Sequence, residues 1–144
     1  MLYIIKNESD QYFTFLKDDP VRGSIPHLNR IGINKEIFTL IKDDRPAAIT
    51  CVNYLDNIPS GEEELFKPIE KPTVAVFYTI WSYAPKSGRE LLFSAVDYVK
   101  ENKPDIKRFA TLSPKTDLAA RFHLKNGAVV YRVNSDSINY EYKF

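Results

Sequence analysis

The chain alternates apolar and polar positions in a way that predicts strands along its first half and strands separated by helices along its second half. Residues 2–6 form a short apolar run, and residues 36–56 form two apolar runs around a polar turn at Asp43 to Pro46, which predicts a β-hairpin. The stretch 73–83, TVAVFYTIWSY, is almost entirely apolar. Such a run is typical of a central strand that is covered on both faces.

A helix is predicted directly after this strand. Ser87 precedes Glu90 by three residues, which is the spacing of a capping box, and Pro104 ends the pattern. One face of the predicted helix is apolar and consists of Leu91, Leu92, Ala95, Val96 and Val99.

The C-terminal part of the chain predicts a second helix between strands. Ser113-Pro114 has the sequence of an N-cap followed by proline at the first helical position, and Asn126-Gly127 is a common helix end. Strands are predicted at 106–112, 128–134 and 137–144.

The remaining segments give weaker signals. Residues 10–34 predict a short helix among loops, and Ser60 with Glu63 has a capping-box spacing that predicts one or two helical turns. Alternating strands and helices in the second half call for a mixed sheet with helices packed on it. We therefore predict an α/β (α+β) fold, with a mixed central sheet flanked by helices, as a single domain over residues 1–144.

Composition and charge exclude several functions. The 144 residues carry 20 Lys plus Arg against 19 Asp plus Glu, so the net charge of +1 favours neither a nucleic-acid nor a membrane partner. The single cysteine, Cys51, lies in a predicted strand and is expected to be a buried apolar residue rather than a nucleophile. The opening run MLYII is too short for a signal sequence, which predicts a cytoplasmic protein. No metal site is predicted.

The junction WSYAPKSGRELL joins the most apolar strand to the clearest helix. The unpaired N–H groups of a helix N-terminus form an anion site that suits a pyrophosphate. Gly88 would let the backbone approach the ligand, and Lys86 and Arg89 could add positive charge. The alternative is an ordinary helix start with a solvated basic pair.

The order of motifs resembles the GNAT superfamily of acyl-CoA-binding N-acetyltransferases. In the strand-to-helix loop only Gly88 matches the family's pyrophosphate motif, whereas Tyr83 and Lys86 depart from it. The later helix matches better, at Ala119, Phe122, His123, Lys125, Gly127 and Ala128. The position that usually holds a tyrosine general acid is occupied by His123.

A closer resemblance, over roughly residues 33–144, is to the GNAT-fold catalytic domain of the malonyl-CoA decarboxylase family. Four motifs occur in the same order: AVFYTI (75–80), TLSP (111–114), FHLKNGAVVYRVN (122–134) and NYEY (139–142). The family's helical insert between its Ser-Pro and its histidine, and its N-terminal helical domain, have no counterpart here.

The resemblance implies a coenzyme A thioester, acetyl-CoA or malonyl-CoA, as substrate. It places the catalytic residues at His123 and Ser113, and it places backbone groups that hold the thioester at Ile80, Trp81 and Ser82. Residues Lys86, Ser87, Gly88 and Arg89 would bind the pyrophosphate. Without the resemblance, the favoured interpretation of His123 is a structural core histidine, and that of Ser113 is a helix cap.

The implied chemistry is a proton transfer beside the thioester. In a decarboxylase, His123 with an ordinary pKa near 6.5 would protonate an enolate, and the Ser113 hydroxyl would bind the departing carboxylate. In an acyltransferase, His123 would protonate the leaving thiolate after an amine attacks. A non-catalytic acyl-CoA-binding module or degenerate GNAT domain is the alternative. Residues 7–32 are expected to form the acceptor side of the cleft, and the sequence leaves open whether the chain forms a homodimer.

Overall fold

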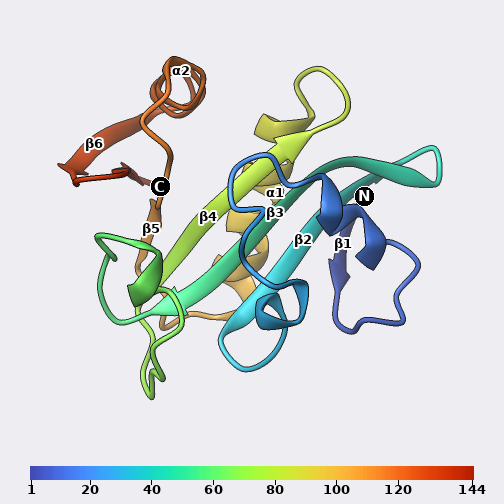
Figure 1. The fold of residues 1–144 in the computed structure, drawn as a ribbon, viewed down its shortest axis with the longest axis horizontal. Helices are drawn as coiled ribbons and strands as arrows, with labels where there is room; N and C mark the ends of the chain where they lie inside the picture. The colour runs from blue at the N-terminus through green and yellow to red at the C-terminus, as the bar shows by residue number, and fades with distance from the viewer.

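The computed structural model describes residues 1–144 and contains one seven-stranded sheet (Figure 1). The sheet order is β1-β2-β3-β4-β5-β7-β6, and only the central β4–β5 pair is parallel. The strands are β1 (Leu2–Ile5), β2 (Lys35–Lys42), β3 (Arg45–Leu55), β4 (Val74–Ser82), β5 (Arg108–Thr111), β6 (Ala128–Val133) and β7 (Ile138–Tyr142). The helices are α1 (Ser87–Asn102) and α2 (Asp117–Lys125), with 3-10 turns η1 (Phe13–Asp18), η2 (His27–Arg30) and η3 (Glu62–Glu64).

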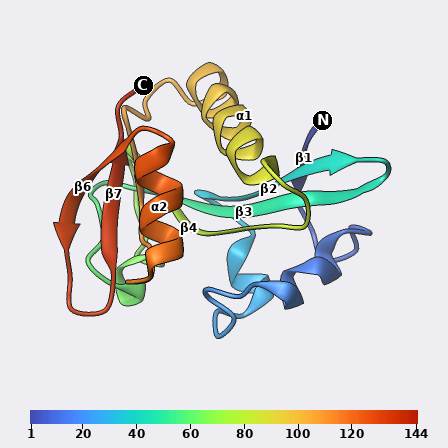
Figure 2. The same ribbon diagram turned by 90° about the horizontal axis from the view of Figure 1, so that it is seen from above.

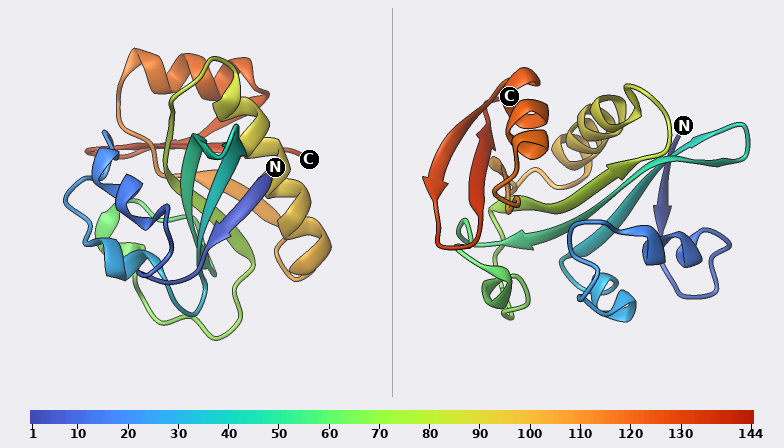
Figure 3. Two further views of the ribbon diagram at one scale, coloured as in Figure 1. Left: turned by 90° about the vertical axis from the view of Figure 1, so that its right-hand side faces the viewer. Right: turned by 45° about the horizontal axis from the view of Figure 1, so that its top comes forward.

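The two faces of the sheet are covered by different parts of the chain. Helix α1 packs on one face of β1–β4, and the N-terminal segment with η1 and η2 lies on the opposite face (Figures 2 and 3). Along β4, Ala75 and Phe77 join the apolar cluster of α1, whereas Val76 and Tyr78 join the cluster of the N-terminal segment. The predicted central strand with two covered faces and the predicted mixed sheet are confirmed.

The predicted hairpin is formed by β2 and β3, with a tighter turn than expected. Asp43 and Asp44 have φ angles of 53° and 61°, the left-handed conformation that two-residue hairpin turns require. Arg45 and Pro46 do not belong to the turn, because they already pair with β2.

The predicted helix caps are wrong at three places, by one residue at α1 and η3 and by three residues at α2. Helix α1 begins at Ser87, but its N-cap is Lys86, with no side-chain cap. Helix α2 begins at Asp117 and is capped by Thr116, whose hydroxyl accepts from the Ala119 N–H at 3.2 Å. At η3, Ser60 bonds to Glu64 rather than to Glu63.

Ser113 does not cap α2 because β7 holds its backbone. The Ser113 N–H donates to the Ile138 carbonyl, and the Ile138 N–H donates to the Ser113 carbonyl, each at 2.9 Å. This long-range pairing extends the sheet by one bridge beyond β5 and delays the helix start. The predicted end of the helix at Asn126-Gly127 is confirmed.

Strands β4 and β5 pair over only four residues. Their register runs from Val74–Arg108 to Phe77–Thr111, and the final bond joins the Leu112 N–H to the Phe77 carbonyl at 3.1 Å. Beyond Phe77 a bulge displaces β4 in its pairing with β3. The two strands therefore separate at their carboxyl ends. No helix of the chain is long and apolar enough to span a bilayer.

Candidate functional site

A cleft of about 370 Å³ lies where β4 and β5 separate. One wall is β4 from Phe77 to Ser82, and the other is the chain from Leu112 through the first two turns of α2. Gly88 at the start of α1 and the pair Pro20-Val21 from the N-terminal segment complete the lining. The cleft is thus built by the parallel strand pair and bounded by both helices.

The lining of the cleft carries no Lys, Arg, Asp or Glu side chain. Its polar groups are hydroxyls and one imidazole, on Thr79, Ser82, Ser113, Thr116 and His123, with Tyr78 and Trp81 also contributing. An uncharged cleft of this size suits a mostly apolar ligand that is oriented by a few polar groups.

His123 reaches the cleft from the last turn of α2, and only 4% of the residue is exposed. Its Nδ1 atom lies 2.7 Å from the hydroxyl of Tyr142 on β7. Its ring stacks on Tyr140, with centroids 5.0 Å apart and planes at 28°. Strand β7 therefore fixes the position of the imidazole, which also forms part of the cleft wall.

Burial lowers the pKa of His123 to about 4, well below the ordinary value expected from the sequence. No carboxylate bonds to the ring, so nothing offsets the loss of hydration that the imidazolium would suffer. His123 is consequently neutral at pH 7. The contact joins Nδ1 to the Tyr142 hydroxyl in either tautomer: when the hydroxyl donates, the ring proton resides on Nε2, and when Nδ1–H donates, Nε2 keeps a free lone pair.

Ser113 lies in the same wall of the cleft, on the segment that leads from β5 to α2, and is buried. Its hydroxyl donates to the Thr111 hydroxyl at 2.7 Å, and Thr111 also accepts from the Tyr140 N–H at 3.1 Å. The Ser113 oxygen keeps its lone pairs for a ligand, whereas its proton is engaged. The structure thus brings the two predicted catalytic residues, Ser113 and His123, to one cleft.

Comparisons with known proteins identify the fold of the chain. No protein-family model matches the sequence, and no curated protein matches it. Malonyl-CoA decarboxylase from Agrobacterium vitis superposes with a TM-score of 0.83 at 17% identity, over 100% of this chain and 60% of that one. The GNAT domain of S. lividans PAT superposes with a TM-score of 0.69 at 11% identity, over 99% and 89%.

A third solved structure, PaiA N-acetyltransferase from Thermoplasma acidophilum in complex with coenzyme A, has a TM-score of 0.65 at 11% identity, over 100% and 99%. The chain has the GNAT fold. It spans 60% of the length of the decarboxylases that it matches.

Within this GNAT fold, the predicted loop residues fall into two groups. Ile80, Trp81, Ser82 and Gly88 line the cleft, whereas Lys86, Ser87 and Arg89 do not. Arg89 instead donates to the Asn126 side-chain oxygen at 2.7 Å, and its guanidinium lies 4.7 Å from the centroid of the Phe93 ring. Ser87 is fully buried, and its hydroxyl has no hydrogen-bond partner.

Gly88 lies close to Phe122 where α1 meets α2. A Cβ atom built on Gly88 would lie 3.2 Å from Cε1 of Phe122, which also lines the cleft. Lys86, two residues earlier, has a φ of 65°, so the loop enters α1 through a left-handed residue. The loop is therefore shaped tightly around the mouth of the cleft.

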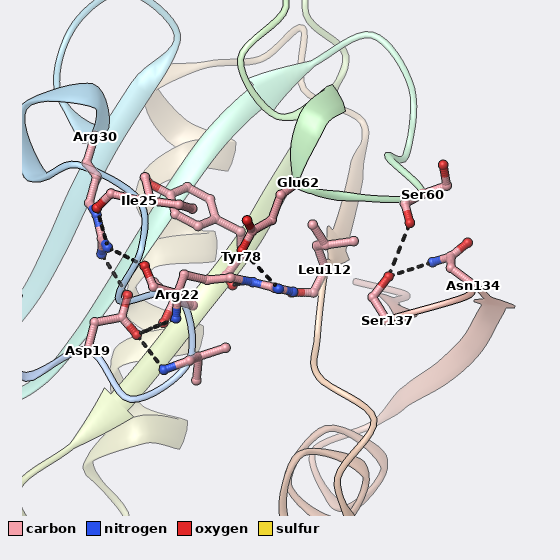
Figure 4. A network of polar contacts seen from close by, with 12 residues as sticks. Asp19, Arg22, Ile25, Arg30, Ser60, Glu62, Tyr78, Leu112, Asn134 and Ser137 are labelled. Atoms are coloured by element: carbon pink, nitrogen blue, oxygen red, sulfur yellow. Dashed lines mark hydrogen bonds and ion pairs between the residues drawn. The ribbon is translucent and has the colours of Figure 1, made fainter.

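The N-terminal segment contributes groups that sequence reasoning missed. Asp19 accepts from Arg30 at 2.7 Å (Figure 4). It also accepts from the Thr79 hydroxyl at 2.7 Å and from two backbone N–H groups. Burial by itself would raise the pKa of Asp19, but the hydrogen bonds from the backbone of Arg22 and Val21, Thr79 and Arg30 hold it below its ordinary value. This buried ion pair fixes Pro20-Val21 against the cleft.

No sequence signal marked that pair, because two charged residues in a loop-like segment are normally solvated. The sequence also predicted the environment of Cys51. Cys51 is a buried thiol, as predicted, and burial raises its pKa to about 11. His27, in the N-terminal segment, is half-buried, and its ring lies 6.1 Å from that of Phe13.

Proposed function

We propose that this GNAT-fold chain uses an acyl-CoA thioester, whose acyl end lies in the β4–β5 cleft, and that His123 moves a proton beside the thioester. The observation that carries the proposal is the place of His123, a neutral imidazole in the wall of an uncharged cleft with its Nδ1 held by Tyr142. The coenzyme A in the Thermoplasma PaiA complex, a protein of the same fold, supports the choice of ligand.

The thioester carbonyl would bind to the backbone of β4. Residues Ile80 to Ser82 pair with β3 on one side only, because β5 has already ended. Their remaining backbone groups therefore border the cleft without a strand partner. Fixed N–H groups at such a position stabilise negative charge on a carbonyl oxygen.

The pyrophosphate would bind at the N-terminus of α1. The first helical bond there runs from the Glu90 N–H to the Lys86 carbonyl at 3.3 Å, so the N–H groups of Gly88 and Arg89 precede the ladder. A 16-residue helix adds its dipole to these donors. Exposed Lys86 would supply the nearest charge, whereas Arg89 is engaged with Asn126.

His123 begins the reaction neutral, so it must first accept a proton and form an imidazolium before it can deliver one; the proton comes from the attacking amine in acyl transfer and from water in decarboxylation. A negative charge that develops on an enolate or a thiolate within about 4–6 Å favours the protonated imidazole and raises its pKa towards neutrality. The proton is thus stabilised on His123 only while the anion is present. That behaviour suits a group that delivers a proton late in the reaction.

Two reactions fit this arrangement. In decarboxylation, the bond between the α-carbon and the carboxylate breaks, CO₂ leaves, and the electron pair forms an enolate that is then protonated at carbon. In acyl transfer, an amine attacks the carbonyl, and the thiolate leaves and takes a proton. The uncharged lining offers a malonyl carboxylate no counter-ion, which destabilises that carboxylate relative to its decarboxylated product.

The test is to incubate the protein with malonyl-CoA and with acetyl-CoA separately, each with and without a mixture of primary amines, and to follow all products by mass. Acetyl-CoA formed from malonyl-CoA identifies a decarboxylase, and an acetylated amine identifies a transferase. His123→Gln should abolish either activity, whereas Ser113→Ala should affect decarboxylation and transfer alike, because the Ser113 proton is engaged with Thr111 and does not reach a carboxylate.

The alternative function is a binding module without catalysis. It predicts that acetyl-CoA raises the melting temperature while no product forms in any mixture. If neither thioester changes the melting temperature at millimolar concentration, the acyl-CoA proposal itself is wrong.

A further inference from the structure

Arg22 spans the gap that opens between β4 and β5. Its Nε donates to the Tyr78 carbonyl at 3.2 Å, and its Nη2 donates to the Leu112 carbonyl at 2.8 Å (Figure 4). Its Nη1 donates to Glu62 at 3.2 Å, and 12% of its side chain is exposed. One guanidinium thus joins the two strands just past their last backbone bond.

Arg22 replaces sheet hydrogen bonds that the divergence removes. The ladder ends with the Leu112 N–H on the Phe77 carbonyl. In a continuing parallel pair, the Leu112 carbonyl would accept from a β4 N–H group. Here a side chain satisfies both that carbonyl and the carbonyl of Tyr78. The planar guanidinium of arginine can donate to two acceptors at once in a fixed geometry. The ammonium group of lysine has no such fixed geometry.

Two cavities share Leu112, whose carbonyl accepts from Arg22. The cleft described above contains Pro20, Val21, Tyr78 and Leu112 in its lining. A second, polar cavity of about 590 Å³ also reaches Leu112. The rest of its lining is Arg22, the loop 60–63 and the β6–β7 loop 134–137. Arg22 therefore lies at the boundary between the cleft and the second cavity.

The backbone of Arg22 is fixed as firmly as its side chain. Its N–H donates to Asp19 at 3.0 Å, and its carbonyl accepts from Arg30 at 2.8 Å. Arg30 is fully buried and paired with Asp19. A residue held at its backbone and at all three guanidinium nitrogens makes a rigid partition rather than a movable side chain.

We propose that Arg22 limits the length of the acyl group by closing the inner end of the cleft against the second cavity. It is a positioning residue, because it acts through the carbonyls of Tyr78 and Leu112, which set the separation of the strands. The proposal rests on the proposed use of an acyl-CoA thioester. It implies that the cleft accepts short acyl groups such as acetyl or propionyl and binds an octanoyl group poorly.

The test compares the dissociation constants of free coenzyme A, acetyl-CoA and octanoyl-CoA in four proteins: wild type, Arg22→Ala, Arg22→Lys and Glu62→Gln. In Arg22→Ala the two cavities join, so octanoyl-CoA should gain about tenfold or more relative to acetyl-CoA. Arg22→Lys should shift the same ratio in the same direction by less. Glu62→Gln removes only the outer partner of Arg22 and should leave the ratio unchanged.

Free coenzyme A serves as the internal reference, because it carries no acyl group. A folded Arg22→Ala or Arg22→Lys protein that binds coenzyme A but keeps the wild-type ratio overturns the role of Arg22 alone. Arg22→Lys keeps the cation, so it tests the same point if Arg22→Ala does not fold. A wild-type protein that binds no coenzyme A at all overturns the proposed function together with this inference.

Discussion

The hydroxyl of Tyr142 lies 2.7 Å from Nδ1 of His123, and it is the only hydrogen-bond partner of that ring. Both groups are buried, and burial raises the pKa of Tyr142 while it lowers that of His123. Both groups are therefore neutral at pH 7, and the contact with the phenol leaves only Nε2 of the imidazole free for the cleft. The β7 strand thus determines which ring nitrogen can act in the cleft.

Replacing Tyr142 by Phe should leave His123 without its partner. We expect the protein to lose about 1–3 kcal/mol of stability, because a buried acceptor is left unsatisfied. Nitrogen NMR of the imidazole should change from one fixed tautomer to a mixture. Tyr140→Phe is the matched control, because it keeps the ring that stacks on His123 and removes only a hydroxyl outside this bond. Equal spectra for the two variants would contradict the assignment.

The buried imidazole should make the protein sensitive to acid. Its pKa is about 4 in the folded state and about 6.5 in the unfolded state, so between these values the unfolded chain binds more protons. Burial of the neutral imidazole therefore does not lower the free energy of unfolding above pH 6.5. As the pH drops to 4, the free energy of unfolding falls by about 3 kcal/mol in all. The melting temperature of His123→Gln should fall less between pH 7.5 and pH 4.5 than that of the wild type.

Other acids with shifted pKa values affect both proteins equally, so the comparison isolates His123. Lowered pKa values at Asp19 and Glu141, for example, also weaken the fold at low pH. Identical pH profiles for the wild type and His123→Gln would mean that the imidazole is not buried as described.

Gly88→Ala tests the closeness of α1 and α2 at the cleft mouth. The added methyl would lie 3.2 Å from Phe122, so this ring, which lines the cleft, must shift by a few tenths of an ångström. We expect about tenfold weaker binding of coenzyme A with little loss of stability. Phe122→Leu makes room for the methyl, so the double variant should bind better than Gly88→Ala alone. Failure of this rescue would assign the loss to the loop itself.

The buried pair of Asp19 and Arg30 should be a major determinant of stability. Both side chains are fully buried, and Asp19→Ala would leave an uncompensated guanidinium, at a cost of about 3–5 kcal/mol. Adding Arg30→Met should recover part of that loss. The exposed Lys42–Glu90 pair is the control, and Glu90→Ala should change stability by less than about 1 kcal/mol. Urea denaturation measures all four proteins.

Local sequence predicted the parts of the fold that local physics determines. The apolar run of β4, the β2–β3 hairpin and the apolar face of α1 each carried their own signal. The resemblance also marked the position of His123, and the structure places this residue on the cleft. The hydrophobic period of a strand or of a helix can be recognised within one short stretch of sequence.

The rest depends on contacts between distant segments. Ser113 looked like a helix cap, but Ile138, 25 residues later, pairs with its backbone. Arg22 and Arg30 looked like solvated loop residues, and only the divergence of β4 from β5 gives Arg22 its two carbonyls. The partners of these residues are set by the tertiary fold, and no spacing in the sequence encodes them.

The central claim is that the β4–β5 cleft binds an acyl-CoA thioester. Isothermal titration with coenzyme A and acetyl-CoA, on the wild type and on Ala119→Trp, tests it most directly. Ala119 is a half-exposed residue in the cleft wall, so a bulky side chain there fills the cleft without disturbing the core. The claim predicts one saturable site per chain in the wild type and none in Ala119→Trp. No binding to the wild type, or equal binding to both proteins, would contradict it.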